Sequence, residues 1–341
     1  MNKRAFLEGF LTASTVAFGG QFMWQRMQRP DTLRVAGTAA TGAAELARSA
    51  GSVAPPGTLT RNPAEAFAFT PLEIDSTQPA RGIPRQAPTL ERPIAVATLS
   101  DQQVDSYLRK IRNFDAVFAS DIFLDPSYEA LLLKTTAHMA RVESYMGHGN
   151  FNLMSFDEML VAGRNFPAIG PFESDELNFL EEVFFANPNR YGFFGKKISH
   201  SLTEVISRQD VAKIARTGHF LWRGESFNLY NRLKQDVGHD LVLTSGVRSV
   251  VKQMHLFLAK AVEANGNLSR ASRSLAPPGH SYHGVGDFDI GKIGFGARNF
   301  TADFSSTDEY RKIANLGYVD IRYPTDNLFG VRFEPWHIKI A

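Results

Sequence analysis

An α+β fold is predicted for this chain of 341 residues, with a mostly helical unit placed before a smaller unit of short strands and flanking helices. Between Ser100 and Phe184, apolar residues recur at helical spacing behind capping residues such as Ser100 and Ser174. After Val237, short apolar runs such as residues 241–244 alternate with turns rich in glycine and proline, as short buried strands do. Hydrophobic residues make up 43% of the chain, so most of it is expected to fold.

The overall charge and the absence of cysteine exclude several classes of function. The net charge is +2, with 37 basic and 35 acidic residues, and this balance gives no electrostatic case for binding nucleic acid. The chain has no cysteine, which excludes disulfides, thiol catalysis and thiolate metal sites. Any metal must therefore be held by histidine, aspartate, glutamate or water.

Residues 1–30 have the pattern of an export signal or membrane anchor. Lys3 and Arg4 come first, and the uncharged stretch 9–20 that follows is too short to span a membrane as a helix. Residues 2–8 resemble a twin-arginine export signal in which Lys3 replaces the first arginine. An ordinary amphipathic N-terminal helix is the alternative. The signal predicts a periplasmic or cell-envelope protein, and retention of the N-terminus would tether it to the membrane.

Three further segments are predicted behind this signal. Residues 31–95 are rich in proline, alanine and glycine and hold no lasting apolar period, so they should form a disordered tether. Residues 96–222 should form a helical domain of unknown role, and residues 223–341 a separate C-terminal domain. The helices expected with most detail cover residues 127–145, 156–161, 226–237, 250–264 and 305–316, with a polar loop over 265–274 and a strand over 318–323.

The C-terminal domain contains a candidate metal site. His283, Asp289 and His337 offer nitrogen and oxygen ligands that suit zinc, and three protein ligands leave a fourth position for water. Glu334 lies close to His337 in sequence and is a candidate base. Pro335 excludes helical geometry at Glu334, so this segment is extended. In an extended segment Glu334 and His337 point to opposite sides, and a local distortion is needed if both are to face one metal.

Arg248 is a second candidate functional residue. It follows the strand predicted over residues 241–244 and precedes the helix predicted over residues 250–264. Such junctions present side chains to a cleft, and arginine can hold a carboxylate through two parallel hydrogen bonds. A surface arginine in a salt bridge is the alternative interpretation.

Residues 225–341 resemble the VanY-type D-alanyl-D-alanine carboxypeptidases. These are zinc peptidases that share a fold with the D-Ala-D-Ala dipeptidases and the hedgehog signalling domain. The resemblance implies a small antiparallel-sheet zinc peptidase domain with flanking helices. It is carried by residues 245–249 with Gln253, and by residues 278–283, 289–291, 317–318, 322–324 and 334–337.

The resemblance also implies roles for individual residues. His283, Asp289 and His337 would bind zinc. Glu334 would act as general base and acid, and Arg248 would stabilise the substrate's carbonyl oxygen or carboxylate. Ser281 would hold the peptide, and the other residues implied in substrate binding are Gln253, Tyr282 and Trp336.

The spacing of the ligands departs from the family pattern. The family places its aspartate seven residues after the first histidine, whereas Asp289 follows His283 by six. A one-residue deletion beside Gly286 explains this most simply. Asp287 paired with either His280 or His283 gives two alternative ligand sets.

The function implied is zinc-dependent hydrolysis of D-amino-acid-containing peptides of bacterial peptidoglycan, in the first place as a D-alanyl-D-alanine carboxypeptidase acting on stem peptides. The alternative is a non-catalytic, metal-containing module of the same fold that binds the cell wall or a protein. Glu334 and Arg248 favour the enzyme, because binding alone needs neither a base nor a partner for an oxyanion. The shortened step from His283 to Asp289 favours the module.

Overall fold

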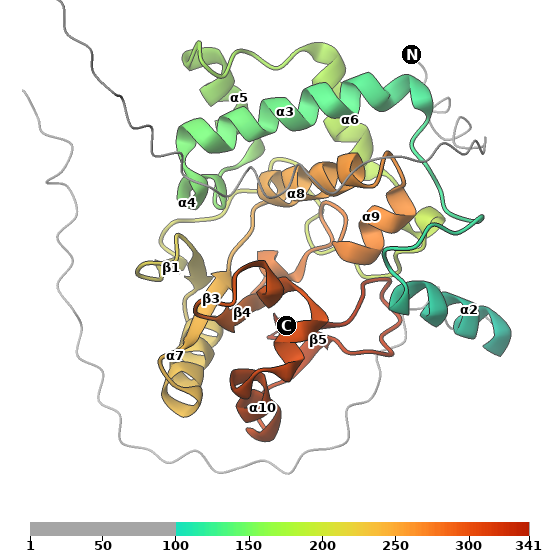
Figure 1. Cartoon of the computed structure of the whole chain (residues 1–341). Coiled ribbons are helices and arrows are strands. Elements are labelled where there is room, and N and C mark those ends of the chain that lie inside the picture. Colours follow the sequence, from blue (N-terminus) through green and yellow to red (C-terminus); the bar gives the residue numbers. More distant parts are fainter. Residues whose placement is uncertain (1–99, 341) are drawn as a thin grey trace, which may run out of the picture. The chain divides into compact units, whose positions relative to one another are not determined.

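The computed structural model describes residues 100–340, so the predictions made for residues 1–95 lie outside it. Within the described range, helices and small antiparallel sheets occur together, which confirms the α+β class (Figure 1). No helix among residues 100–340 combines the length and apolarity needed to cross a membrane.

The first half of the described chain is helical, as the apolar spacing and the cap at Ser100 predict. The cap predicted at Ser174 is wrong by one residue, because Glu173 caps the helix that begins at Ser174. The hydroxyl of Ser100 accepts a hydrogen bond from the backbone N–H of Gln103, and the side chain of Gln103 accepts one from Ser100 in return. Ser155 and Glu158 form the same reciprocal cap. The helices are α2 (Asp101–Arg112), α3 (Glu129–Met146), α4 (His148–Phe151), α5 (Phe156–Asn165) and α6 (Ser174–Phe185).

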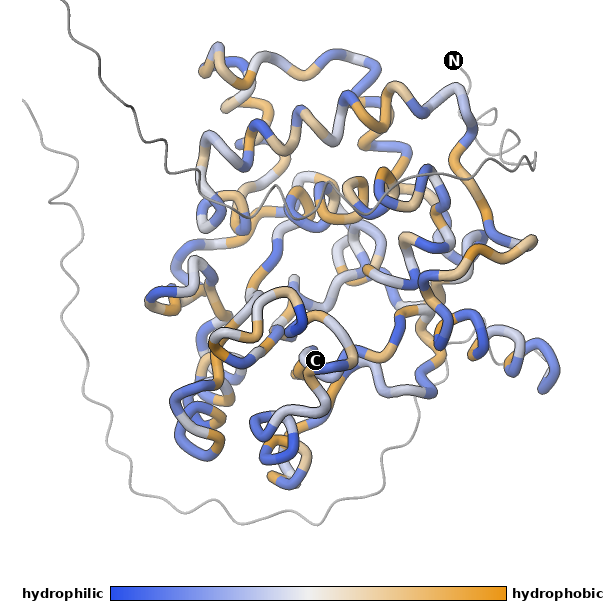
Figure 2. The backbone as a smooth tube through the Cα atoms, in the orientation of Figure 1, coloured by the Kyte–Doolittle hydropathy of each residue, from blue (hydrophilic) through white to orange (hydrophobic). Residues whose placement is uncertain are grey.

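A hydrophobic core joins these helices to α8 (Val250–Glu263) from the C-terminal part of the sequence. Met139 of α3, Phe179 of α6 and Phe257 of α8 are each at most 1% exposed and belong to one cluster. Hydrophobic and hydrophilic positions alternate along α3 and α8, as in helices with one apolar face (Figure 2). The helical segment is therefore held to the C-terminal part by apolar burial.

Polar contacts reinforce this junction. Glu143 of α3 accepts hydrogen bonds from Lys252 Nζ (2.6 Å) and His255 Nδ1 (2.9 Å), both on α8. The backbone N–H of Ser249 donates to the carbonyl oxygen of Asn152 (2.8 Å). Ser249 caps α8 and follows Arg248, so the helical segment contacts the backbone beside a candidate functional residue.

The polar loop expected over residues 265–274 is wrong, because the chain forms α9 (Leu268–Ser274) there. Asn267 caps this helix by accepting from the backbone N–H of Arg270. Leu268 and Ala271 are buried against α8. Two apolar residues in a polar segment were too weak a signal to indicate a helix, and tertiary packing supplies the rest.

The C-terminal part is built on a four-stranded antiparallel sheet with the strand order β3-β4-β6-β5. Phe288, Ile290 and Trp336 are buried on this sheet in a second core. The strands are β3 (Leu241–Ser245), β4 (Phe288–Lys292), β5 (Ile321–Tyr323) and β6 (Glu334–Ile338), flanked by α7 (Glu225–Val237) and α10 (Asp308–Asn315). A separate hairpin pairs β1 (Val211–Lys213) with β2 (Phe220–Trp222).

Candidate metal centre

The sheet register brings two of the predicted ligands together. Asp289 of β4 lies directly opposite His337 of β6 in the antiparallel ladder. The side chains of directly opposite residues are neighbours. The strand pairing therefore brings Asp289 and His337 together, although they are 48 residues apart in the sequence. Both side chains are buried, with 2% and 4% exposed.

His283 reaches the same place from a short 3₁₀ turn, Tyr282–Gly284, just before β4. Its Nδ1 donates to the carbonyl oxygen of Gly246 (2.8 Å), which leaves Nε2 as the nitrogen facing Asp289. A histidine that ligates a metal usually has its other nitrogen fixed in this way. The six-residue step from His283 to Asp289 therefore brings both side chains to one site.

Glu334 lies at this site because β6 is distorted. Ile321 pairs with Ile338, and Tyr323 pairs with Glu334. The two pairs are two residues apart along β5 but four residues apart along β6, so the register shifts between them. This irregularity supplies the distortion that the extended segment required. The Oε2 atom of Glu334 lies 3.2 Å from Nδ1 of His337.

Arg248 is held against Asp289. A register shift in β3 sets Ser245 opposite Asp289. The Nε of Arg248 donates to the hydroxyl of Ser245 (2.9 Å), and its Nη2 donates to Oδ2 of Asp289 (2.6 Å). The side chain is 11% exposed, so it is no surface arginine, although it does form an ion pair.

Two buried atoms at this site have no hydrogen-bond partner, and this fits a metal. Nε2 of His283 and Oδ1 of Asp289 are inaccessible to solvent and unsatisfied, although they lie 3.3 Å apart. Leaving such groups unsatisfied costs free energy, and a shared cation would satisfy both. One ligand atom each from His283, Asp289 and His337 lies within 4.8 Å of the others. These residues thus form a group able to bind a metal, and their donor set suits zinc.

The electrostatics of the site differ at each ligand. Burial, with the nearby Arg248 guanidinium, lowers the pKa of His283 to about 4. Burial would also lower the pKa of His337, but its hydrogen bonds to Asp287 and Glu334 raise it to about 9. Burial opposes ionisation of Asp289, but His283 and Arg248 hold the pKa of that carboxyl well below its ordinary value. A carboxylate is therefore available at the site at neutral pH.

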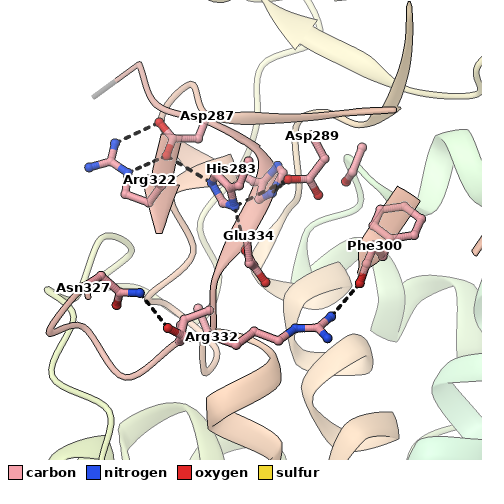
Figure 3. Close-up of polar contacts among 12 residues, drawn as sticks. His283, Asp287, Asp289, Phe300, Arg322, Asn327, Arg332 and Glu334 are labelled. Carbon is pink, nitrogen blue, oxygen red and sulfur yellow. Dashed lines mark hydrogen bonds and ion pairs between the residues drawn. The ribbon is translucent and has the colours of Figure 1, made fainter. Parts of the chain in front are cut away.

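Asp287, an alternative ligand in the sequence analysis, lies on the outer side of His337. Its Oδ2 accepts from Nε2 of His337 (3.1 Å), whereas Nδ1 of that ring faces Asp289 (3.5 Å) and Glu334. Arg322 binds both carboxylate oxygens of Asp287, at 2.7 and 2.9 Å (Figure 3). Asp287 thus has the position of a residue that orients a ligand. The sequence analysis did not predict this role for Asp287 or Arg322, because it depends on the rotation of one imidazole ring.

The remaining predicted residues lie at different distances from this group. His280, the other alternative ligand, points away, with Nδ1 hydrogen-bonded to the carbonyl oxygen of Lys196 (3.0 Å). The hydroxyl of Ser281 forms no hydrogen bond with any residue of the described range, and substrate contact stays a prediction for it. The other three are buried with structural partners: Gln253 against Ala276, Tyr282 under the Arg322 guanidinium, and Trp336 against Phe300.

Replacement of Arg322 by methionine should destabilise the protein by about 3–5 kcal/mol, because it removes the guanidinium that binds both oxygens of the buried carboxylate of Asp287. The side chains of this pair are 2% and 0% exposed. Urea unfolding of the metal-free protein at neutral pH measures the loss. Arg298→Met is the matched control, since Arg298 pairs with Asp303 at the surface and its loss should cost less than about 1 kcal/mol. Equal losses in the two variants would contradict the account.

Two histidines and a carboxylate around one position, with a second carboxylate beside them, define the class of single-metal hydrolase sites. Residues 225–340 match the family model of VanY, D-alanyl-D-alanine carboxypeptidase. The resemblance that the motifs predict is thus confirmed for this segment, which matches the VanY family model. A search of curated protein sequences finds no significant match.

Two solved structures are similar to parts of the chain. One is a mutant of the vancomycin-resistance D,D-pentapeptidase VanY from the VanB-type resistance cassette in complex with Zn(II). It shares 24% sequence identity and a TM-score of 0.32, and the match covers 38% of this chain and 76% of that one. The other is VanYB in complex with D-alanine-D-alanine, with the same identity and TM-score and coverage of 39% and 80%.

Proposed function

We propose that residues 225–340 form a zinc-dependent D,D-carboxypeptidase that releases the terminal D-alanine from peptidoglycan stem peptides. The observation that carries the proposal is the position of Glu334, whose carboxylate lies 3.2 Å from Nδ1 of the candidate ligand His337. A site that only bound a metal would have no use for a second carboxylate beside its ligands.

Glu334 is the residue that moves protons in this mechanism. Zinc held by His283, Asp289 and His337 would supply a Lewis acid and lower the pKa of a bound water to about 7. Glu334 takes the proton from the attacking water and passes it to the amine of the leaving residue. Its carboxylate lies beside the group of ligands, with Oε2 3.2 Å from Nδ1 of His337.

Arg248 is the residue that stabilises the oxyanion in this mechanism. Its guanidinium is fixed by Asp289 and Ser245, so it is oriented before substrate binds. A preoriented cation stabilises the developing oxyanion without the cost of reorganising solvent. Its charge also balances that of the ligand Asp289.

The substrate class is inferred from similarity. The matching family is described as D-alanyl-D-alanine carboxypeptidase, and one similar structure holds D-alanine-D-alanine. Export through the signal expected in residues 1–30, with the N-terminus either released or kept as a membrane tether, is part of the same proposal. It would bring the domain to the compartment in which stem peptides are exposed.

Incubation with defined muropeptides, followed by mass analysis of the products, tests the proposal. We expect loss of one alanine residue from a pentapeptide stem and no change in a tetrapeptide stem. Cleavage within cross-linked peptides would instead indicate an endopeptidase. Binding of muropeptides without any cleavage by zinc-loaded protein would favour the non-catalytic module and contradict the proposal.

A further inference from the structure

Arg332, two residues before Glu334, is a half-buried cation without a carboxylate partner in the described range. Its Nη2 donates to the carbonyl oxygen of Phe300 (2.8 Å), and its Nε is buried with no hydrogen-bond partner. The guanidinium lies over the rings of Phe114 (4.4 Å) and Trp336 (5.1 Å). The five N–H donors of the Arg332 guanidinium thus have one protein acceptor in the described range, the carbonyl oxygen of Phe300.

Such an arrangement is costly unless an anion completes it. Guanidinium groups taken out of water are normally paired with carboxylates or phosphates. Stacking on aromatic rings recovers part of this cost but leaves the buried Nε of Arg332 unsatisfied. Burial lowers the pKa of Arg332, and Glu334 is the foremost of the carboxylates that oppose this effect. The guanidinium therefore lies within the electrostatic reach of the proposed general base.

Arg332 also lies on the appropriate side of the site. Residues two apart on an extended chain share a face, so Arg332 and Glu334 project in the same general direction. Figure 3 shows the guanidinium of Arg332 on the side toward which the carboxylate of Glu334 points, away from Asp287 and Arg322. The two other arginines of the site are already engaged, Arg248 by Asp289 and Arg322 by Asp287.

A carboxypeptidase substrate places an anion on the Glu334 side of the site. Glu334 delivers its proton to the nitrogen of the leaving residue. The free α-carboxylate of that residue is attached to the carbon next to the same nitrogen, so it lies on the Glu334 side of the scissile bond. An endopeptidase substrate has an uncharged peptide bond there, which gains little from a guanidinium.

We propose that Arg332 binds the free α-carboxylate of the substrate's last residue and thereby selects a chain end over an internal peptide bond. Arg248 stabilises the oxyanion and Arg332 recognises the carboxylate. The inference deepens the proposed function and rests on it.

Steady-state kinetics on a pair of substrates tests this role. One substrate is a stem pentapeptide with a free C-terminal carboxylate, and the other is the same peptide with a C-terminal amide. Arg332→Met should raise KM for the acid by about tenfold to a hundredfold, as loss of a hydrogen-bonded charge does, with little change in kcat. The KM for the amide should not change, so the preference for the acid disappears. Arg332→Lys should restore part of it.

Control variants separate this role from a structural one. Arg298→Met removes an exposed arginine and should leave both substrates unaffected. A proportional fall of kcat/KM for acid and amide in Arg332→Met would overturn the inference, as would unchanged kinetics with both. Should Arg332→Met fail to fold, the acid-to-amide ratio of Arg332→Lys gives the same decision: a reduced ratio supports the inference, and an unchanged ratio overturns it.

A binding measurement tests the role of Arg332 independently of whether the protein has the proposed catalytic activity. Calorimetric titration of the zinc-loaded wild type and Arg332 variants with D-alanine-D-alanine and its amide needs no turnover. Absence of hydrolysis would overturn the proposed function alone. Equal affinity of the wild type for the acid and the amide would overturn the role of Arg332.

Discussion

Glu334→Gln should slow the release of D-alanine by about a hundredfold to ten-thousandfold while zinc content stays at the wild-type level. Glutamine keeps the volume of the side chain and a hydrogen-bonding oxygen near His337, but it cannot accept the proton of the attacking water. Glu334 is not among the three residues that form the candidate metal group, so metal binding should persist. Single-turnover kinetics and metal analysis on the same preparation measure both quantities.

A matched glutamate is available as control for this variant. Glu309 of α10 is also buried, at 6% exposure, but pairs with Lys292 away from the metal group. Glu309→Gln should leave the rate of release close to that of the wild type. Undiminished turnover by Glu334→Gln would show that another group carries the proton, and the assigned mechanism would be abandoned.

Asp289→Ala should abolish stoichiometric zinc binding, whereas Asp287→Ala should retain it with an affinity about 10–100-fold weaker. The difference follows from position. Oδ1 of Asp289 is one of two unsatisfied buried atoms that face each other at the site. Asp287 contacts the far nitrogen of His337 and is also held by Arg322 and by the backbone N–H of Ile340.

Zinc titrations of the two variants, prepared side by side, measure the difference. Dialysis against zinc-free buffer should leave Asp289→Ala without metal and Asp287→Ala partly loaded. The opposite order would assign the ligand to Asp287 and support the alternative register. Melting curves of the metal-free proteins control for destabilisation, because each variant removes one partner of a buried charge pair.

The local elements of the fold could be predicted from sequence where caps and apolar periods agree. The cap at Ser100 is in place, α8 covers Val250–Glu263 against the expected 250–264, and β3 extends the expected 241–244 by one residue. Helix α9 shows the limit of this approach, since the buried face of Leu268 and Ala271 exists only against α8. Apolar periodicity and capping residues indicate local structure, but they do not reveal which elements pack against each other in the folded protein.

The candidate site could be predicted as a set of residue types but not as an arrangement. The motifs named His283, Asp289, His337 and Glu334, and the structure brings these four together. The division between Asp289 at the metal group and Asp287 behind His337 follows from strand register and ring rotation, which no spacing in the sequence reveals.

The role inferred for Arg332 depends on what surrounds it. Arg332 precedes β6 and belongs to no sequence motif that would indicate a function. Its interest arises from burial over two aromatic rings without a carboxylate partner in the described range, and the rings come from residues 218 positions and four positions away, Phe114 and Trp336. Only the folded chain brings such distant side chains around one guanidinium.

The most direct test of the central claim is a titration of metal-free protein with zinc while the release of D-alanine from a stem pentapeptide is recorded. The account predicts no release without metal, a linear rise, and a plateau at one zinc per chain, with no activity in Asp289→Ala at any zinc concentration used. Release that persists in the metal-free protein, or a fully zinc-loaded protein that releases nothing, would contradict it.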